Sequence, residues 1–195
     1  MMTGTRPAAT HPASAPAASQ PTNVEFMGVG GRAASVVFVC DASGSMLNKF
    51  DTLRRQLSKA ITALAPEQRF GIVLMQEEGS AALNASLLPA LPENVGLVDD
   101  FVVVSRFRAE TDPIPAIEAA FSMRPELIYL LTDGDFRDSA AVVRRIRELV
   151  KDDRIRINTI AFVGEGDKDT DFLTVLKQVA AESRGTYARV NEGAP

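Results

Sequence analysis

The sequence predicts an α/β domain built around a mainly parallel β-sheet. From Ser35 onward, short apolar runs alternate with amphipathic segments, which is typical of βα units. The chain has 195 residues, of which 46% are hydrophobic, so it can bury one sizeable core, and its length favours one domain over two. Internal repeats are absent, which sets solenoids and propellers aside. We therefore expect a single domain over residues 24–195.

Each element is expected from its own pattern. Five apolar runs of strand length predict the sheet, at residues 35–40, 70–75, 127–132, 156–163 and 186–190. Four segments with apolar residues at helical spacing alternate with them, at 49–64, 113–122, 139–150 and 171–183. The region 84–107 carries weaker signals, which favour an edge strand at 85–89 and a helix at 92–104 that begins on a proline.

Residues 1–23 differ in composition from the rest of the chain. They are rich in Ala, Pro, Ser and Thr and have almost no large apolar side chain, so they cannot offset the entropy lost on ordering. We expect a flexible leader. It suits a spacer from a membrane anchor or from another domain of a longer parent chain, whereas Met1 also allows a complete small protein of the cytoplasm.

Composition excludes several classes of function. The net charge is -4, and both signs are spread along the chain, so no electrostatic footprint for nucleic acid is present. No apolar stretch approaches the roughly 20 residues that cross a bilayer, so direct membrane insertion is not expected. The only histidine, His11, lies in the leader, which argues against Ser-His-Asp hydrolases and His-ligated zinc enzymes. Cys40, the only cysteine, has no partner for an intrachain disulfide.

Oxygen-bearing side chains follow two of the expected strands. Asp41, Ser43 and Ser45 come directly after the first strand, and Asp133 comes directly after the third. Open α/β sheets keep their sites at the edge where the carboxyl ends of parallel strands meet. Thr111 precedes a helix, and its loop can reach the same edge. Carboxylates and hydroxyls are ligands of hard divalent cations, so the pattern indicates a metal site.

These five residues, in this order, resemble the metal-ion-dependent adhesion site (MIDAS) of von Willebrand factor A (VWA) domains, of the bacterial single-domain type. The resemblance covers about residues 24–190. It implies a three-layer, Rossmann-like fold with a mainly parallel six-stranded sheet, one antiparallel edge strand and helices on both faces. It also implies a bound Mg²⁺, or Mn²⁺ or Ca²⁺ in its place. In that family pattern Ser43 and Ser45 bind the ion directly, Thr111 binds it directly or through water, and Asp41 and Asp133 act mostly through water.

The expected function is protein binding and not catalysis. Hydroxyls are neutral ligands, so a site with only two carboxylates leaves a divalent ion with residual positive charge and an open coordination position. Such an ion favours an incoming Asp or Glu side chain of a partner protein. Only residues 191–195 follow the last expected strand, so the resemblance also leads us to expect that the C-terminal helix, which slides during affinity switching in integrin-type domains, is absent.

Three other interpretations stay open. Asp41, Ser43, Thr111 and Asp133 are residue types that also cap helices and form turns. The order of acidic and hydroxyl residues is similar to that of haloacid-dehalogenase-type magnesium-dependent phosphatases, where Asp41 would be the nucleophile, although Ser43 stands where that family has its general acid. A scaffold domain that binds a metal without an acidic partner would show metal-dependent stability alone.

Overall fold

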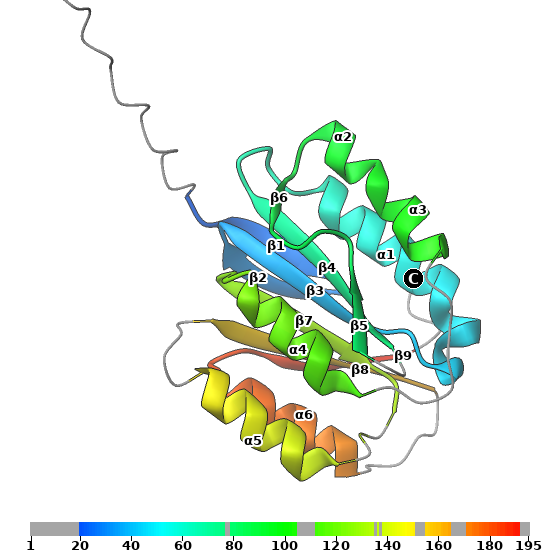
Figure 1. Cartoon of the computed structure of the whole chain (residues 1–195), viewed down its shortest axis with the longest axis vertical. Helices are drawn as coiled ribbons and strands as arrows, with labels where there is room; N and C mark the ends of the chain where they lie inside the picture. The colour runs from blue at the N-terminus through cyan, green and yellow to red at the C-terminus, as the bar shows by residue number, and fades with distance from the viewer. Residues whose placement is uncertain are drawn as a thin grey trace, which may run out of the picture.

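A mixed β-sheet forms the centre of the domain (Figure 1). The computed structural model describes residues 20–76, 79–104, 112–134, 136, 138–150, 155–164 and 171–191. Five parallel strands lie side by side in the order β4, β3, β7, β8, β9, with the bounds Arg69–Gln76, Ser35–Asp41, Leu127–Thr132, Arg156–Val163 and Tyr187–Asn191. Two short strands, β5 (Gly79–Ala82) and β6 (Leu88–Pro89), pair antiparallel with opposite ends of the outer edge of β4. Together these two strands form the one antiparallel edge of the sheet.

Helices cover both faces of the sheet, which gives three layers (Figure 1). One face carries the 3₁₀ helix η1 and the α-helices α1, α2 and α3, with the bounds Gly44–Lys49, Phe50–Thr62, Pro92–Val95 and Leu97–Val104. The other face carries α4, α5 and α6, with the bounds Pro113–Ser122, Ser139–Val150 and Asp171–Glu182. The predicted fold class, a mainly parallel sheet between two helical layers, is confirmed.

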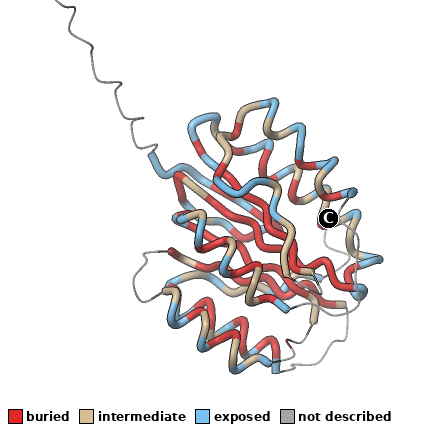
Figure 2. The backbone as a smooth tube through the Cα atoms, in the orientation of Figure 1, coloured by how far each residue is buried: buried red, intermediate tan, exposed pale blue. Residues whose placement is uncertain are grey.

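The strands β3, β4, β7 and β8 are buried on both faces, and this separates the core into two halves (Figure 2). Along β3, Phe38 and Cys40 point into the half that α1 and α3 cover, while Val37 and Val39 point into the half under α4, α5 and α6. Successive side chains of a strand point to opposite faces, so a central strand must be apolar at every position. At the end of β3, this continuous apolar run gives way to the carboxylate of Asp41.

A hairpin that the sequence analysis did not predict precedes the sheet. Strand β1 (Thr22–Phe26) begins inside the range expected to be a leader and pairs antiparallel with β2 (Val29–Ala33). The connecting residues Met27 and Gly28 both have positive φ, as a tight two-residue hairpin turn requires. The Tyr129 hydroxyl fixes the hairpin to the sheet, because it lies within hydrogen-bond distance of the carbonyl oxygens of Val24 (3.1 Å) and Val29 (2.9 Å).

Most of the other elements lie where the sequence places them. The expected ranges 127–132, 156–163, 113–122 and 139–150 coincide with β7, β8, α4 and α5. The helix expected at 92–104 is divided at Gly96 into α2 and α3, and the edge strand expected at 85–89 is reduced to the two residues of β6. Strand β5 was not predicted, since its sequence, Gly-Ser-Ala-Ala, has low β-propensity. In the described part of the chain, no helix has both the length and the apolar composition that crossing a bilayer requires.

Candidate metal centre

Asp41 is the last residue of β3 and lies at the carboxyl edge of the sheet, where only 3% of its surface is exposed. Its Oδ1 accepts a hydrogen bond from the backbone N–H of Ser43 at 2.8 Å, so the chain turns tightly after the strand. Its Oδ2 accepts a hydrogen bond from the hydroxyl of Thr132, the last residue of β7, at 2.6 Å. Because β3 and β7 are parallel neighbours, their ends lie together and fix both oxygens of one carboxylate.

A chain of hydrogen bonds continues from this carboxylate across the sheet edge. The hydroxyls of Ser43 and Ser45 lie 2.9 Å apart, and the Ser45 hydroxyl donates to Oδ1 of Asp133 at 2.7 Å. Asp133 directly follows β7. The structure therefore brings Asp41, Ser43, Ser45 and Asp133 together, although 88 residues separate Ser45 from Asp133 in sequence.

Thr111, the fifth predicted ligand, lies outside the described residues, and so does Asp135 beside the Asp133 turn. The neighbour of Thr111, Asp112, is described and caps α4, since its Oδ1 accepts from the backbone N–H of Ile114 at 2.9 Å. Asp112 was not among the residues that the sequence analysis considered as caps. No such cap is formed by Ser43, which precedes η1 without a side-chain cap hydrogen bond.

Lys49 takes part in the cluster, and the sequence analysis did not anticipate it. Its Nζ donates to Oδ2 of Asp133 at 2.8 Å. The Asp133 side chain is fully buried and the Lys49 side chain is only 12% exposed, so water screens this ion pair weakly. The ammonium also lies 6.0 Å from the ring centroid of Phe162, over its face. The two oxygens of Asp133 thus have different partners: a hydroxyl on one side and a cation on the other.

Lys49 carries no clear sequence signal. It is the last residue of η1 and immediately precedes α1. The dipole of η1 favours a positive charge at its C-terminus and the dipole of α1 disfavours one at its N-terminus, so the helix position alone does not indicate an anionic partner. Thr132, by contrast, could have been identified, because a hydroxyl at the end of a mainly apolar strand must find an acceptor once it is buried.

Burial dominates the electrostatics of Asp41. The low polarity around it raises the pKa of its carboxyl group above the ordinary aspartate value, and hydrogen bonds from Thr132 and Ser43 counteract part of that rise. The negative charge of Asp133 adds to the rise. A bound cation would act in the opposite direction, since it stabilises the ionised form of a neighbouring carboxylate.

The donor set fits a hard divalent cation that keeps some of its water. It consists only of oxygen, from the carboxylates of Asp41 and Asp133 and the hydroxyls of Ser43 and Ser45. Mg²⁺ prefers oxygen ligands, dehydrates reluctantly and is usually bound by one or two carboxylates. Within the described ranges, no group of three or more His, Cys, Asp or Glu side chains is placed to hold a metal ion.

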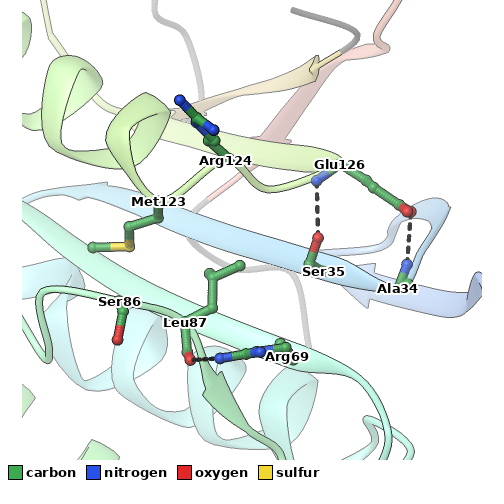
Figure 3. A pocket seen from close by; sticks show the side chains of 8 residues that line it. All are labelled: Ala34, Ser35, Arg69, Ser86, Leu87, Met123, Arg124 and Glu126. Atoms are coloured by element: carbon green, nitrogen blue, oxygen red, sulfur yellow. Dashed lines mark hydrogen bonds between the residues drawn. The ribbon is translucent and has the colours of Figure 1, made fainter. Parts of the chain in front are cut away.

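A cleft of about 390 Å³ opens at the other end of the sheet, where β3, β4 and β7 begin (Figure 3). Two of its charged groups are bonded within the fold: the Glu126 carboxylate accepts from the Ala34 N–H at 2.8 Å, and Arg69 donates to the Leu87 carbonyl at 2.7 Å. Because the cleft lies at the amino ends of the strands, it is separate from the cluster at the carboxyl edge. Its lining residues are Ala34, Ser35, Arg69, Ser86, Leu87, Met123, Arg124 and Glu126.

Known proteins resemble this chain in structure. No protein-family model and no curated protein matches its sequence. A von Willebrand factor type A structure from Catenulispora acidiphila superposes with a TM-score of 0.67 at 19% identity; the match covers 83% of this chain and 40% of the length of that one. The VWA domain of SpRpn10 superposes with a TM-score of 0.59 at 12% identity, and the match covers 83% of this chain and 89% of that domain.

Both matches are similarities of fold, at sequence identities of 19% and 12%. They share with this chain the layered α/β architecture that the resemblance of five residues had implied. The protein therefore has the Rossmann-like fold of a von Willebrand factor A domain.

Proposed function

We propose that this domain binds a divalent cation at the carboxyl edge of its sheet and uses the bound ion to capture an acidic side chain of a partner protein. The proposal rests on the chain of side-chain hydrogen bonds from Ser43 through Ser45 to Asp133, which lies beside the buried carboxylate of Asp41. Hydroxyls 2.9 Å apart at one edge, with a carboxylate on either side, supply oxygen donors of the type that Mg²⁺ or Mn²⁺ requires.

The protein residues have distinct parts in this proposal. Ser43 and Ser45 would bind the ion directly, Asp41 and Asp133 would hold its water ligands, and Thr111 would complete the set from its loop. When bound, the ion supplies a Lewis-acidic position that a foreign carboxylate can occupy. The hydrogen bonds to Asp41 from Ser43 and Thr132 keep that carboxylate fixed before any ion arrives, so little ordering entropy remains to be lost on binding.

Binding is favoured over phosphoryl transfer by the same contacts. A phosphatase of the alternative type needs Asp41 as an accessible nucleophile. Here the side chain is buried, and each of its oxygens already accepts a hydrogen bond. At the position of the missing general acid, the Ser43 hydroxyl contacts Ser45. We therefore propose a binding module and not an enzyme.

Calorimetric titration with Mn²⁺ and with Mg²⁺ tests the metal part of the proposal. The protein is expected to bind one ion, and Ser45→Ala is expected to weaken that binding at least tenfold, because it removes a direct ligand. Ser122→Ala is the matched control: that hydroxyl donates to the Ala119 carbonyl on the exposed face of α4, away from the cluster. A wild-type protein that binds neither ion, or a Ser45→Ala protein that binds as wild type does, contradicts the metal site.

The acidic-ligand part needs a separate titration. NMR chemical shifts are followed while N-acetylglutamate N-methylamide is added in Mg²⁺, with the glutamine analogue and an EDTA sample as controls. Shift changes are expected around Ser43 and Ser45 only with the acidic probe and only in Mg²⁺. Metal binding without any response to the acidic probe would instead indicate a metal-stabilised scaffold, and magnesium-dependent phosphatase activity that Asp41→Asn abolishes would indicate the enzyme.

A further inference from the structure

We infer that Lys49 is a built-in counter-cation which lowers the affinity of the proposed metal centre for divalent ions and makes the ion, once bound, a stronger attractor of acidic ligands. This inference rests on the proposed function, and it assigns a role to a residue outside the five expected ligands. It begins from one contact, the 2.8 Å ion pair between Lys49 Nζ and Oδ2 of Asp133.

The environment makes this contact more than an ordinary surface ion pair. Exposed pairs contribute little because water and salt screen them. The Asp133 side chain has no exposed surface, and Lys49 is 12% exposed and lies over the Phe162 ring. A charge placed in such surroundings acts on its neighbours through a lower effective dielectric than bulk water provides. Every ion that occupies this cluster therefore experiences the Lys49 charge.

The formal charges of the described residues in the cluster decide the direction of the effect. Asp41 and Asp133 bring two negative charges, Lys49 brings one positive charge, and the hydroxyls of Ser43 and Ser45 bring none. Among these residues, the two carboxylates alone would balance the charge of a divalent ion. Lys49 adds one positive charge to that balance. The same residue thus opposes binding of the metal and favours subsequent binding of a carboxylate.

The geometry explains how Lys49 and an ion can share Asp133. Ser45 contacts Oδ1 at 2.7 Å, while Lys49 contacts Oδ2. The Ser45 hydroxyl and the Lys49 ammonium therefore contact different oxygens of the Asp133 carboxylate. Lys49 can keep its contact with Oδ2 when an ion binds next to Ser45 and Oδ1. In the metal-free domain, Lys49 also compensates the Asp133 carboxylate, which would otherwise be buried next to a second acidic group without an opposite charge.

The test compares the full chain with Lys49→Met, Lys49→Gln and Lys49→Arg. Mn²⁺ affinity is measured by calorimetry, and thermal stability is measured in EDTA and in Mn²⁺. The two neutral variants are expected to bind Mn²⁺ at least about tenfold more tightly, since a unit charge a few ångströms away is removed from a poorly screened site. Their melting temperature should fall in EDTA and rise more than that of wild type on adding Mn²⁺. Lys49→Gln keeps a donor for Asp133, so it guards against a folding defect in Lys49→Met.

Two controls separate the charge of Lys49 from other effects. Lys49→Arg retains the charge and should bind Mn²⁺ within about threefold of wild type. Lys59→Met removes the same charge from an exposed position further along α1, where water and salt screen it, and should also leave Mn²⁺ affinity unchanged. With Mn²⁺ bound, the neutral Lys49 variants should bind N-acetylglutamate N-methylamide more weakly than wild type, a change opposite in sign to the gain for the metal. A residue that merely supported the fold would not produce opposite changes.

Each outcome bears on a different part of the proposal. If wild type binds Mn²⁺ through Ser45 but the neutral Lys49 variants bind it equally or more weakly, the inference about Lys49 is wrong and the metal centre stands. If wild type fails to bind and the neutral variants bind, the inference that Lys49 opposes metal binding is supported, and the proposed function is wrong for the wild-type protein. If neither wild type nor the neutral variants bind, both proposals are wrong.

Discussion

The hydrogen bond from Thr132 to Asp41 offers a test of how the cluster is held before a metal arrives. Thr132→Val removes the hydroxyl that donates to Asp41 Oδ2 at 2.6 Å and keeps the shape of the side chain. Thr132 is 1% exposed and Asp41 is 3% exposed, so water cannot easily replace the lost donor. Hydrogen bonds to charged groups contribute about 1.5–3 kcal/mol, and a buried acceptor left without its donor adds a desolvation cost. We expect the free energy of unfolding to fall by about 2–3 kcal/mol.

The matched control is Thr159→Val. Thr159 is fully buried in the neighbouring strand β8, and its hydroxyl donates to a neutral acceptor, the Leu176 carbonyl, at 2.9 Å. A neutral hydrogen bond contributes only about 0.5–1.5 kcal/mol, so this substitution should cost about half as much. Both values come from urea unfolding in EDTA, followed by circular dichroism. Equal losses for the two variants would refute the idea that Thr132 serves a buried charge, and so would a Thr132→Val protein as stable as wild type.

Three further predictions concern the titration of Asp41, the contact between Tyr129 and the hairpin, and the titration of Tyr129. In EDTA, burial raises the pKa of Asp41 above its ordinary value of 3.8, so the folded state binds this proton more tightly than the unfolded state does. The stability of wild type relative to Asp41→Asn should therefore decline as pH rises above 3.8. A stability difference that is independent of pH between about 3 and 7 would contradict this. Tyr129→Phe should cost about 1–2 kcal/mol, because the Val24 and Val29 carbonyls lose their buried donor. Burial raises the pKa of Tyr129 to about 12, so the folded state resists ionisation of this hydroxyl. Wild type, but not Tyr129→Phe, should therefore lose stability between pH 10 and pH 12. Parallel curves of unfolding free energy against pH for the two proteins would show that this tyrosine is not the cause.

The sequence was most informative where one physical requirement dominates. A central parallel strand must be apolar on both faces, so the bounds of β7 and β8 could be predicted to the residue. The amphipathic helices α4 and α5 could be predicted for the same reason, since each buries a single stripe. The convergence of Asp41, Ser43, Ser45 and Asp133 followed from the topology, because the carboxyl ends of parallel strands share one edge.

Elements stabilised by a pairing partner or a tertiary contact, and not by their own residue types, were not predictable from local pattern. Strand β2 contains two glycines and β5 is Gly-Ser-Ala-Ala, and both form strands because a neighbour supplies hydrogen bonds. The hairpin depends on Phe26, which meets the ring of Phe38 edge to face at 5.1 Å, twelve positions along the chain. The Lys49 contact likewise depends on the position of Asp133, 84 residues later, and no spacing rule connects the two.

We propose that Ser43 and Ser45, with the residues around them, bind a divalent ion. The most direct test is a crystal structure of the full chain grown in Mn²⁺, with an anomalous difference map at the carboxyl edge of the sheet. We expect one anomalous peak within bonding distance of both serine hydroxyls, with Thr111 contacting it directly or through water and Asp41 and Asp133 contacting it mainly through water. A map without a peak there, or a peak at some other place while the serines keep their 2.9 Å contact with each other, would contradict it.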